Sequence, residues 1–321
     1  MRMFQNANFP FVEKRFIAYA ISLITLIAAI IGIAVKGFNW STDFTGGVAT
    51  TINMQPKAAG VQPLHIDKLR KVVTDSGFRE AEIQYIGNPD DANFQIKVKG
   101  TNEEKIKADL ISAISTKLGD YTKGRDLQTD VFREINTVGA KAGSQMRTNV
   151  LVAVFIALIL MIIYIWVRFE FTFGVMGILA LFHDTILIMG VFAWTQKEMT
   201  MQIIAALLTL IGYSINDTIV VFDRIREDLK VYRKDPIPVV FNRAMNQTLS
   251  RTVITGGTTL LTALSLYFFG GSVIHDFALA IWLGIIVGTY SSIFVASNLV
   301  IDTYRFSHKE RQSIKALTKK K

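Results

Sequence analysis

One stretch of the chain decides how it must fold: Leu210-Ile-Gly-Tyr-Ser-Ile-Asn-Asp-Thr-Ile-Val-Val-Phe-Asp-Arg-Ile-Arg226. Its first part belongs to an apolar run from Ile203 to Phe222, which is long enough for a membrane-spanning helix. Asp217 lies inside this run, and a carboxylate at the centre of a bilayer costs roughly 2.5–3.5 kcal/mol unless it is protonated, paired or hydrated. The stretch therefore predicts a helix in lipid that carries one costly acidic group.

Four polar side chains of this stretch fall on one helical face, because they are three and four residues apart: Thr209, Tyr213, Asn216 and Asp217. Such a face fits a proton or ion site, or a charge pair that moves with one. It also fits a polar clasp that holds one helix against its neighbour. We favour the ion site, because an amide and a hydroxyl would be enough for a clasp.

Composition places the whole chain among integral membrane proteins. Of its 321 residues, 50% are hydrophobic, and the mean hydropathy is +0.34. The chain has no cysteine, which excludes disulfides and thiolate chemistry. It has no Gly-rich phosphate loop, so bound ATP is not expected as its energy source. The net charge of +9 gathers beside the apolar runs, which indicates membrane topology and not nucleic-acid binding.

Six apolar segments are long enough to cross a bilayer. The first, residues 16–35, follows a short polar segment, residues 1–15. It is too long for a signal peptide and no small-residue cleavage site follows it, so we interpret it as a retained anchor. The other five predicted spans are residues 150–167, 174–194, 203–222, 252–269 and 277–301.

The distribution of Lys and Arg predicts the orientation of these spans. The basic residues that gather on one side are Arg2, Lys14, Arg15, Arg168, Arg224, Arg226, Lys230, Arg233, Lys234, Arg243, Arg251 and the tail ending in Lys319, Lys320 and Lys321. The short loops on the other side carry essentially Lys197 alone. Both termini are therefore expected in the cytoplasm, including a basic tail at residues 302–321. The cytoplasmic loop, residues 223–251, is expected to form an amphipathic helix pair, broken near Pro236 and Pro238. We favour contact of this loop with anionic lipid over binding of a specific partner.

Residues 36–149 differ from the rest, because they have mixed polarity and predict an extracytoplasmic α+β domain. The predicted strands and helices, in order, are strand 48–54, helix 63–76, strand 81–86, strand 93–98, a helix capped by Thr101 that runs to 118, and strand 126–138. This βαββαβ order is the ferredoxin-like pattern. The domain has no paired carboxylates, histidine cluster or activated nucleophile, so we predict a binding or mechanical role, and the chain is not expected to be an enzyme.

A second polar group begins the fifth span. Arg251 shares a helical face with Thr252, Thr255 and Thr259. Arg251 and Asp217 both lie near the cytoplasmic ends of their spans, so a reversible charge pair between them is geometrically feasible. The alternative is that Arg251 reaches to lipid phosphate.

Two further patterns lie within the spans. His183 and Asp184 form a polar pair in apolar surroundings, and they fit a proton relay or a structural hydrogen bond equally well. Small residues recur every four positions along the last span, at Gly284, Gly288, Ser292 and Ala296. This seam indicates a close helix contact, within the chain or with a partner, and we favour the contact within the chain.

Three motifs, in this order, resemble the SecF family of membrane subunits of the bacterial Sec protein-export system. Phe38-Asn-Trp-Ser-Thr-Asp-Phe-Thr-Gly-Gly47 resembles the head motif that follows its first span. Gly212-Tyr-Ser-Ile-Asn-Asp-Thr-Ile-Val-Val-Phe-Asp-Arg-Ile-Arg-Glu227 resembles its fourth-span motif. Arg251-Thr-Val-Ile-Thr-Gly-Gly-Thr-Thr259 is similar to its fifth-span motif, although the family often has Ser where Gly256 stands.

The resemblance implies a function and partners. It implies pairing with SecD in a twelve-span unit similar to RND transporters, in the bacterial cytoplasmic (inner) membrane. It implies work beside the SecY/SecE/SecG channel and a YajC-type accessory subunit. It implies that the proton gradient, with no cofactor or metal, drives late translocation or release of unfolded polypeptide on the outer side.

The resemblance also carries over particular residues. Asp217 and Arg251 carry over as the proton-responsive pair, and Asp43, Gly46 and Gly47 as a hinge or docking element. His183 and Asp184 match the family pattern with less defined roles.

Alternatives to the predicted coupling ion and to the predicted function remain. Na⁺ is an alternative coupling ion, and an RND-like transporter of small molecules or lipids is an alternative function. An intramembrane aspartyl protease is disfavoured, because the motifs around Asp184 and Asp217 do not resemble that family.

Overall fold

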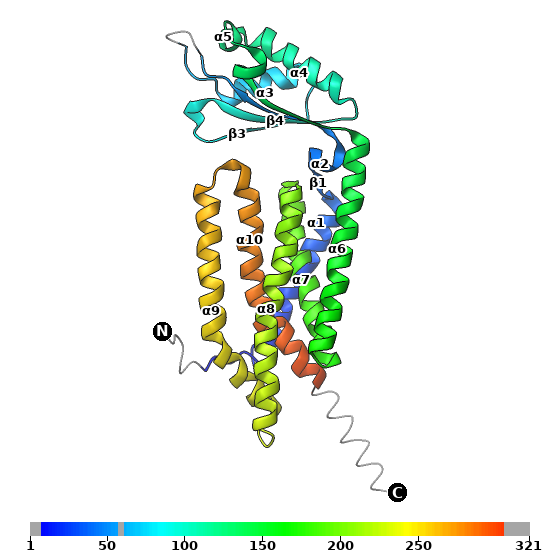
Figure 1. The fold of residues 1–321 in the computed structure, drawn as a ribbon. Coiled ribbons are helices and arrows are strands. Elements are labelled where there is room, and N and C mark those ends of the chain that lie inside the picture. Colours follow the sequence, from blue (N-terminus) through cyan, green and yellow to red (C-terminus); the bar gives the residue numbers. More distant parts are fainter. Residues whose placement is uncertain (1–7, 57–60, 305–321) are drawn as a thin grey trace.

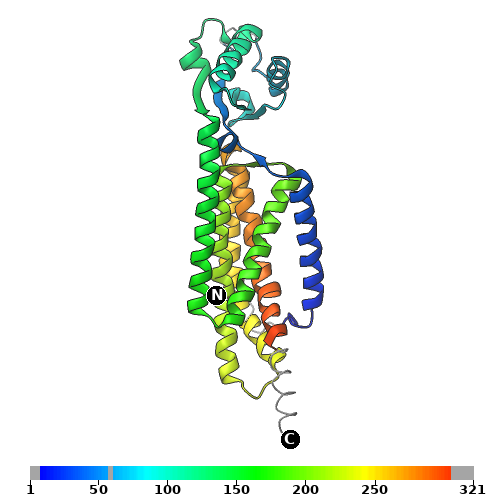
Figure 2. The same cartoon turned by 90° about the vertical axis from the view of Figure 1, so that its right-hand side faces the viewer.

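A computed structural model describes residues 8–56 and 61–304 of the chain. It shows a long bundle of helices with a separate α/β domain standing on one end (Figures 1 and 2). Residues 1–7 of the predicted N-terminal segment and residues 305–321 of the predicted basic tail lie outside the described part.

Six helices in the described part are long and apolar enough to cross a membrane. They are α1 (Arg15–Lys36), α6 (Ala140–Arg168), α7 (Phe171–Thr195), α8 (Met201–Val231), α9 (Ile237–Phe269) and a last helix, Ser272–Tyr304, made of α10 (Ser272–Ser291), the π-helical turn η3 (Ser292–Ala296) and a final helical segment. The prediction of a polytopic α-helical membrane protein is confirmed.

Several helices continue beyond the apolar runs that predicted them. Helix α6 begins at Ala140, ten residues before the expected span, and its first turns pack against the short helix at residues 42–45. Residues 223–251 are not a separate helix pair, because α8 continues to Val231 and α9 already begins at Ile237. Pro236 is the N-cap residue of α9 and Pro238 lies in its first turn, where a missing N–H group is tolerated. The prolines mark a helix start and not a break within a helix.

The α/β domain contains a four-stranded antiparallel sheet with the strand order β3-β4-β2-β5. Its elements along the chain are β2 (Gly47–Asn53), α3 (Ile66–Asp75), β3 (Glu82–Tyr85), the turn η1 (Pro89–Asp91), β4 (Asn93–Lys99), α4 (Glu103–Lys117), α5 (Gly119–Thr122), the turn η2 (Leu127–Val131) and β5 (Phe132–Val138). Phe94, Ile96 and Val98 alternate along β4 and join the core under α3 and α4. The intervening side chains, Gln95 and Lys97, lie on the opposite, polar face of the sheet, which faces the bundle (Figure 1).

Two predicted boundaries in this domain are wrong. The strand expected from Asp126 begins only at Phe132, because Asp126 accepts a hydrogen bond from the N–H of Gln128 (2.8 Å) and starts the turn η2. The N-cap residue of α4 is Asn102 and not Thr101, since the Asn102 side chain accepts from the N–H of Lys105 (3.1 Å).

Short elements join the domain to the bundle. After α1, the chain forms β1 (Asn39–Trp40) and α2 (Thr42–Thr45) before it enters the sheet. Strand β1 pairs in parallel with β6 (Glu198–Met199), which directly precedes α8. At the other end of the bundle, Arg15 of α1 forms an ion pair with Asp302 (3.1 Å).

Candidate functional site

Asp217 lies inside the bundle on α8, where it is 2% exposed. Its Oδ2 atom is buried and has no hydrogen-bond partner. A buried carboxylate without a partner is strongly destabilised in its charged form. The fold thus places this group where binding or loss of a proton changes the free energy of the surrounding helices.

Other buried polar atoms on the helices around Asp217 also lack partners. They are the hydroxyl oxygens of Tyr213 on α8, Thr252 on α9 and Thr289, which lies on α10. Gly256 lies next to two of them, because a Cβ atom placed there would be 3.1 Å from Thr289 Oγ1 and 3.9 Å from Tyr213 Oη. Three adjacent helices therefore present unpaired polar atoms, an environment that suits a proton or a hydrated ion.

Arg251 lies on the exposed surface of α9. It acts electrostatically on Asp217, but no ion pair of 4.0 Å or less joins these two described residues. The structure thus brings the predicted pair into electrostatic range without direct contact. Thr255, one turn further along α9, is partly buried.

The neighbouring helices bury only part of the predicted polar face of α8. Asp217 is buried and Tyr213 is partly buried, whereas Thr209 and Asn216 are exposed on the outside of the bundle. The equal spacing of these residues did not reveal this difference, because burial depends on where α9 and α10 pack.

His183 and Asp184 are buried at the centre of a clasp between three helices. Asp184 Oδ1 lies 2.9 Å from His183 Nδ1, while Oδ2 accepts hydrogen bonds from Ser214 of α8 (2.6 Å) and Ser291 of α10 (2.7 Å). The carboxylate thus has partners at both oxygens, as a structural role requires.

We expect Asp184→Ala to lower the free energy of unfolding by roughly 2–4 kcal/mol, because it leaves buried donors unpaired. Asp184→Asn keeps an oxygen acceptor and is expected to unfold near the wild-type temperature. Thermal unfolding of the detergent-purified variants measures both effects. An Asn variant that is destabilised as much as the Ala variant would contradict this structural role.

The seam of small residues lies against α8. A Cβ atom at Gly288 would be 3.0 Å from Ser214 Cβ, and Ser292 Oγ lies 2.9 Å from Thr218 Oγ1. The interpretation of this seam as a contact within the chain is confirmed.

The head motif connects the domain to two helices. The Asp43 carboxylate accepts hydrogen bonds from Ser41 Oγ (3.1 Å) and from the N–H of Met201 at the start of α8 (3.4 Å). Gly46 has φ = +80°, and a Cβ atom there would lie 2.7 Å from Ala140 Cα at the start of α6. The glycines therefore permit close backbone packing, which favours the docking interpretation of this motif over an open hinge.

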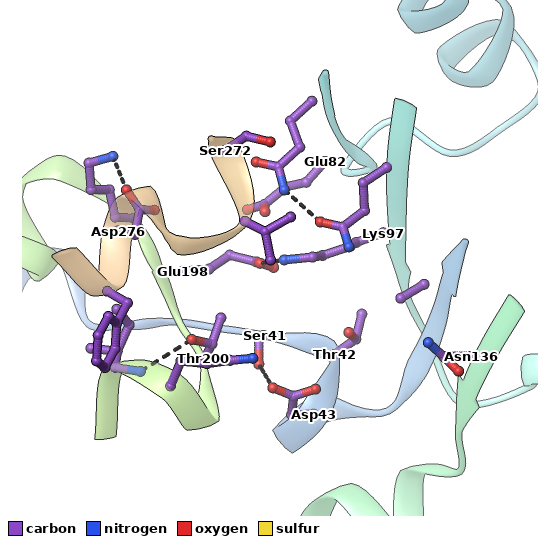
Figure 3. Close-up of a pocket in the computed structure, with 18 of the residues that line it drawn as sticks. Ser41, Thr42, Asp43, Glu82, Lys97, Asn136, Glu198, Thr200, Ser272 and Asp276 are labelled. Carbon is purple, nitrogen blue, oxygen red and sulfur yellow. Dashed lines mark hydrogen bonds and ion pairs between the residues drawn. The ribbon is translucent and has the colours of Figure 1, made fainter. Parts of the chain in front are cut away.

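An ion pair across the domain–bundle interface was not predicted. Lys97 Nζ of β4 lies 2.5 Å from Glu198 Oε2 of β6 (Figure 3). In addition, the Ser272 hydroxyl donates to the carbonyl oxygen of Tyr85 (2.5 Å). The ion pair could not be predicted from the sequence, because 101 positions separate Lys97 from Glu198. One signal for this contact was present in the sequence: Glu198 is the only acidic residue in the short connection between the apolar runs 174–194 and 203–222.

The pKa of Glu198 predicts that the docking of the domain depends on pH. Burial raises the pKa of the Glu198 carboxyl above its usual range, the neighbouring ammonium of Lys97 opposes this rise without cancelling it, and the nearby Glu82 carboxylate adds to it. The docked state therefore binds this proton more tightly than an undocked state with an ordinary pKa. Docking is favoured as the pH falls through the raised pKa and weakened as the pH rises through it.

We expect a larger docked fraction at pH 5 than at pH 8. Because the chain has no cysteine, spin labels at Ser112→Cys and Phe269→Cys report the distance between domain and bundle without interference. Glu198→Gln should remove the pH dependence. Separation of the domain on acidification would contradict the assignment.

Comparisons with known proteins agree with this architecture. The family model described as protein export membrane protein SecD/SecF, C-terminal, matches residues 119–305, and the SecD/SecF GG motif matches residues 31–57. The chain is 40% identical over 300 residues to protein translocase subunit SecF of Desulfurispirillum indicum, covering 91% of this chain and 90% of the relative. The chain belongs to the SecF family. The second match includes Asp43, Gly46 and Gly47, and the first includes Asp217 and Arg251.

Other SecF-family relatives extend the comparison. The SecF subunit of Vibrio alginolyticus is 36% identical, covering 89% of this chain and 86% of the relative. The crystal structure of SecDF from Thermus thermophilus, described as a translocon-associated membrane protein, superposes with a TM-score of 0.78 at 39% identity. That alignment covers 94% of this chain and 39% of SecDF, so the chain spans about two fifths of the longer protein.

Proposed function

We propose that this chain is an accessory subunit of Sec protein export that uses the transmembrane proton gradient to promote late translocation or release of polypeptides. Its relatives are protein translocase subunits, which supports a role in export and not in catalysis. The observation that carries the proton-coupled part is Asp217, a carboxylate 2% exposed within the bundle whose Oδ2 has no partner.

The proposed coupling begins with a change of charge on α8. When Asp217 is ionised, Arg251 of α9 attracts it; when Asp217 takes up a proton, that attraction is lost. The two helices then repack. This is a shift between two arrangements of α8 and α9, biased by one proton.

Helix α8 provides the connection from this site to the domain. Asp217 lies sixteen residues from the helix start at Met201, which corresponds to about 24 Å along the axis. Met201 donates to Asp43, and Glu198 just before it holds Lys97 of the sheet. A shift of α8 would therefore act on two of the contacts that hold the domain.

A second membrane protein is proposed to cover α8 and α9. Asn216 is exposed on the outside of the bundle within an apolar span, and Arg251 is exposed at the end of the next one; contact with lipid is unfavourable for such polar groups. SecD is the proposed partner, because the Thermus relative is a single SecDF chain. The SecY/SecE/SecG channel, a YajC-type subunit and the exported polypeptide complete the proposed assembly.

The proposed orientation places both termini in the cytoplasm of a bacterium and the α/β domain outside. Helix α1 begins at Arg15 and α6 ends at Arg168, both at the end of the bundle opposite the domain (Figure 1), and Arg226 donates to the carbonyl oxygen of Arg168 (3.5 Å). This placement of basic residues supports the orientation. We propose a ferredoxin-like plan for the domain, supported by the strand order β3-β4-β2-β5 and the element order β2-α3-β3-β4-α4-β5.

The proposal is tested with membrane vesicles that contain the chain, SecD and the Sec channel. Export of a precursor is followed with and without an ionophore, under a proton gradient or a sodium gradient. Stimulation by the proton gradient that the ionophore removes supports the proposal. Stimulation by sodium alone would assign Na⁺ as the coupling ion, and equal export in vesicles without the chain would refute the function.

A further inference from the structure

A cavity of about 380 Å³ separates the polar face of the sheet from the adjoining end of the bundle (Figure 3). Its walls come from three parts of the chain: the sheet, the head motif and the bundle. The residues used below are Asp43, Glu82, Gln84, Gln95, Lys97, Lys197, Glu198 and Asp276.

The lining of this cavity carries excess negative charge. Its lysines are already paired, Lys97 with Glu198 and Lys197 with Asp276 (2.5 Å each). The other two carboxylates bond neutral donors among the described residues. Glu82 accepts from the Asn39 amide (2.9 Å), and Asp43 accepts from a hydroxyl and a backbone N–H. Glu82 and Asp43 thus have no ion-pair partner within 4.0 Å among the described residues, and a cation in the cavity would stabilise both carboxylates.

One buried side chain has an unused acceptor in this cavity. Glu198 is 7% exposed, and Lys97 engages only its Oε2 atom. Its Oε1 atom is buried without a hydrogen-bond partner. An unpaired carboxylate oxygen at such a depth is stabilised when an N–H donor from a bound group reaches it.

The shape and the lining favour an organic cation on a peptide. The described residues contain no group of three or more His, Cys, Asp or Glu that would hold a metal ion. Strand β3 is an edge strand, so an extended chain running along it would place alternate side chains toward the cavity. The amides of Gln84 and Gln95 supply donors and acceptors of the kind that a peptide backbone requires.

We propose that this cavity binds a lysine or arginine side chain of an extended polypeptide segment. The proposal rests on the proposed function, because the segment is part of the exported chain. The ammonium or guanidinium group donates to Glu198 Oε1 and is attracted by Glu82 and Asp43. The cavity thereby gives the domain–bundle interface a preference for basic segments.

The test uses the full chain in lipid nanodiscs and fluorescent peptides rich in Ser and Thr that differ only in one central residue, Lys or Met. Fluorescence anisotropy measures their affinities. We expect the Lys peptide to bind more tightly, and Glu82→Gln to weaken its binding by about fivefold. Gln keeps the oxygen that Asn39 contacts, so folding should be retained.

A matched control is Glu104→Gln, which makes the same change on the exposed surface of α4, on the other side of the sheet. It should leave both affinities unchanged. Equal affinities for the Lys and Met peptides, or equal effects of Glu82→Gln and Glu104→Gln, would overturn the proposal. Displacement of the Lys peptide by spermidine at equal or lower concentration would overturn the assignment to a polypeptide.

The vesicle assay separates this proposal from the proposed function. If the Lys peptide shows no preference while export still responds to the proton gradient, only the cavity assignment fails. If export does not respond at all, the proposed function fails whatever the peptides show.

Discussion

Replacing Asp217 with asparagine is expected to abolish the part of export that an ionophore removes. Asparagine has nearly the same shape but does not ionise, so the variant remains in one charge state and Arg251 loses its variable partner. Because Asp217 Oδ2 makes no hydrogen bond in the fold, the substitution removes no direct contact at that atom. Export should fall to the rate of wild-type vesicles treated with ionophore.

The matched control is Asp223→Asn on the same helix. Asp223 is 39% exposed and forms an ion pair with Arg168 (2.5 Å). Exposed pairs contribute about 1 kcal/mol or less, so this variant should export normally and respond to the ionophore. Thermal unfolding and co-purification with SecD verify that both variants fold and assemble. Undiminished, ionophore-sensitive export by the folded Asp217→Asn variant would exclude Asp217 as the coupling group.

The sequence could predict the membrane helices because lipid imposes length and hydropathy locally. It could also single out Asp217, since a carboxylate in an apolar run is unusual whatever surrounds it. The burial of Asp217 and the exposure of Asn216 could not be predicted. These residues are adjacent on α8, and which of them is buried depends on where the neighbouring helices pack.

Contacts between distant segments were also beyond the reach of sequence patterns. Lys97 is one of two lysines on an alternating strand, and nothing in its local sequence indicates Glu198 as its partner. The start of α6 at Ala140 was missed for a related reason. Its first turns are polar and fall outside the apolar run, and their position depends on the close approach of Gly46.

Gly46→Ala is expected to cause a large loss of stability. Gly46 has φ = +80°, where an L-residue costs about 1–2 kcal/mol. The added Cβ would also lie 2.7 Å from Ala140 Cα and 2.8 Å from Ala140 N. These are backbone atoms that cannot rotate away, so overpacking adds about 1–3 kcal/mol and the total is roughly 2–5 kcal/mol.

Gly77→Ala separates the two contributions. Gly77 has φ = +99°, but a Cβ atom there would meet nothing within 4 Å, so only the backbone term of about 1–2 kcal/mol applies. Thermal unfolding of both purified variants measures the difference, and limited proteolysis shows whether the domain separates from α6. Equal destabilisation would mean that the backbone conformation alone requires glycine at position 46. A larger loss at Gly46, with earlier cleavage between the domain and α6, would show that the head motif holds the domain through close packing, so that movement of α8 reaches the sheet through a stiff joint.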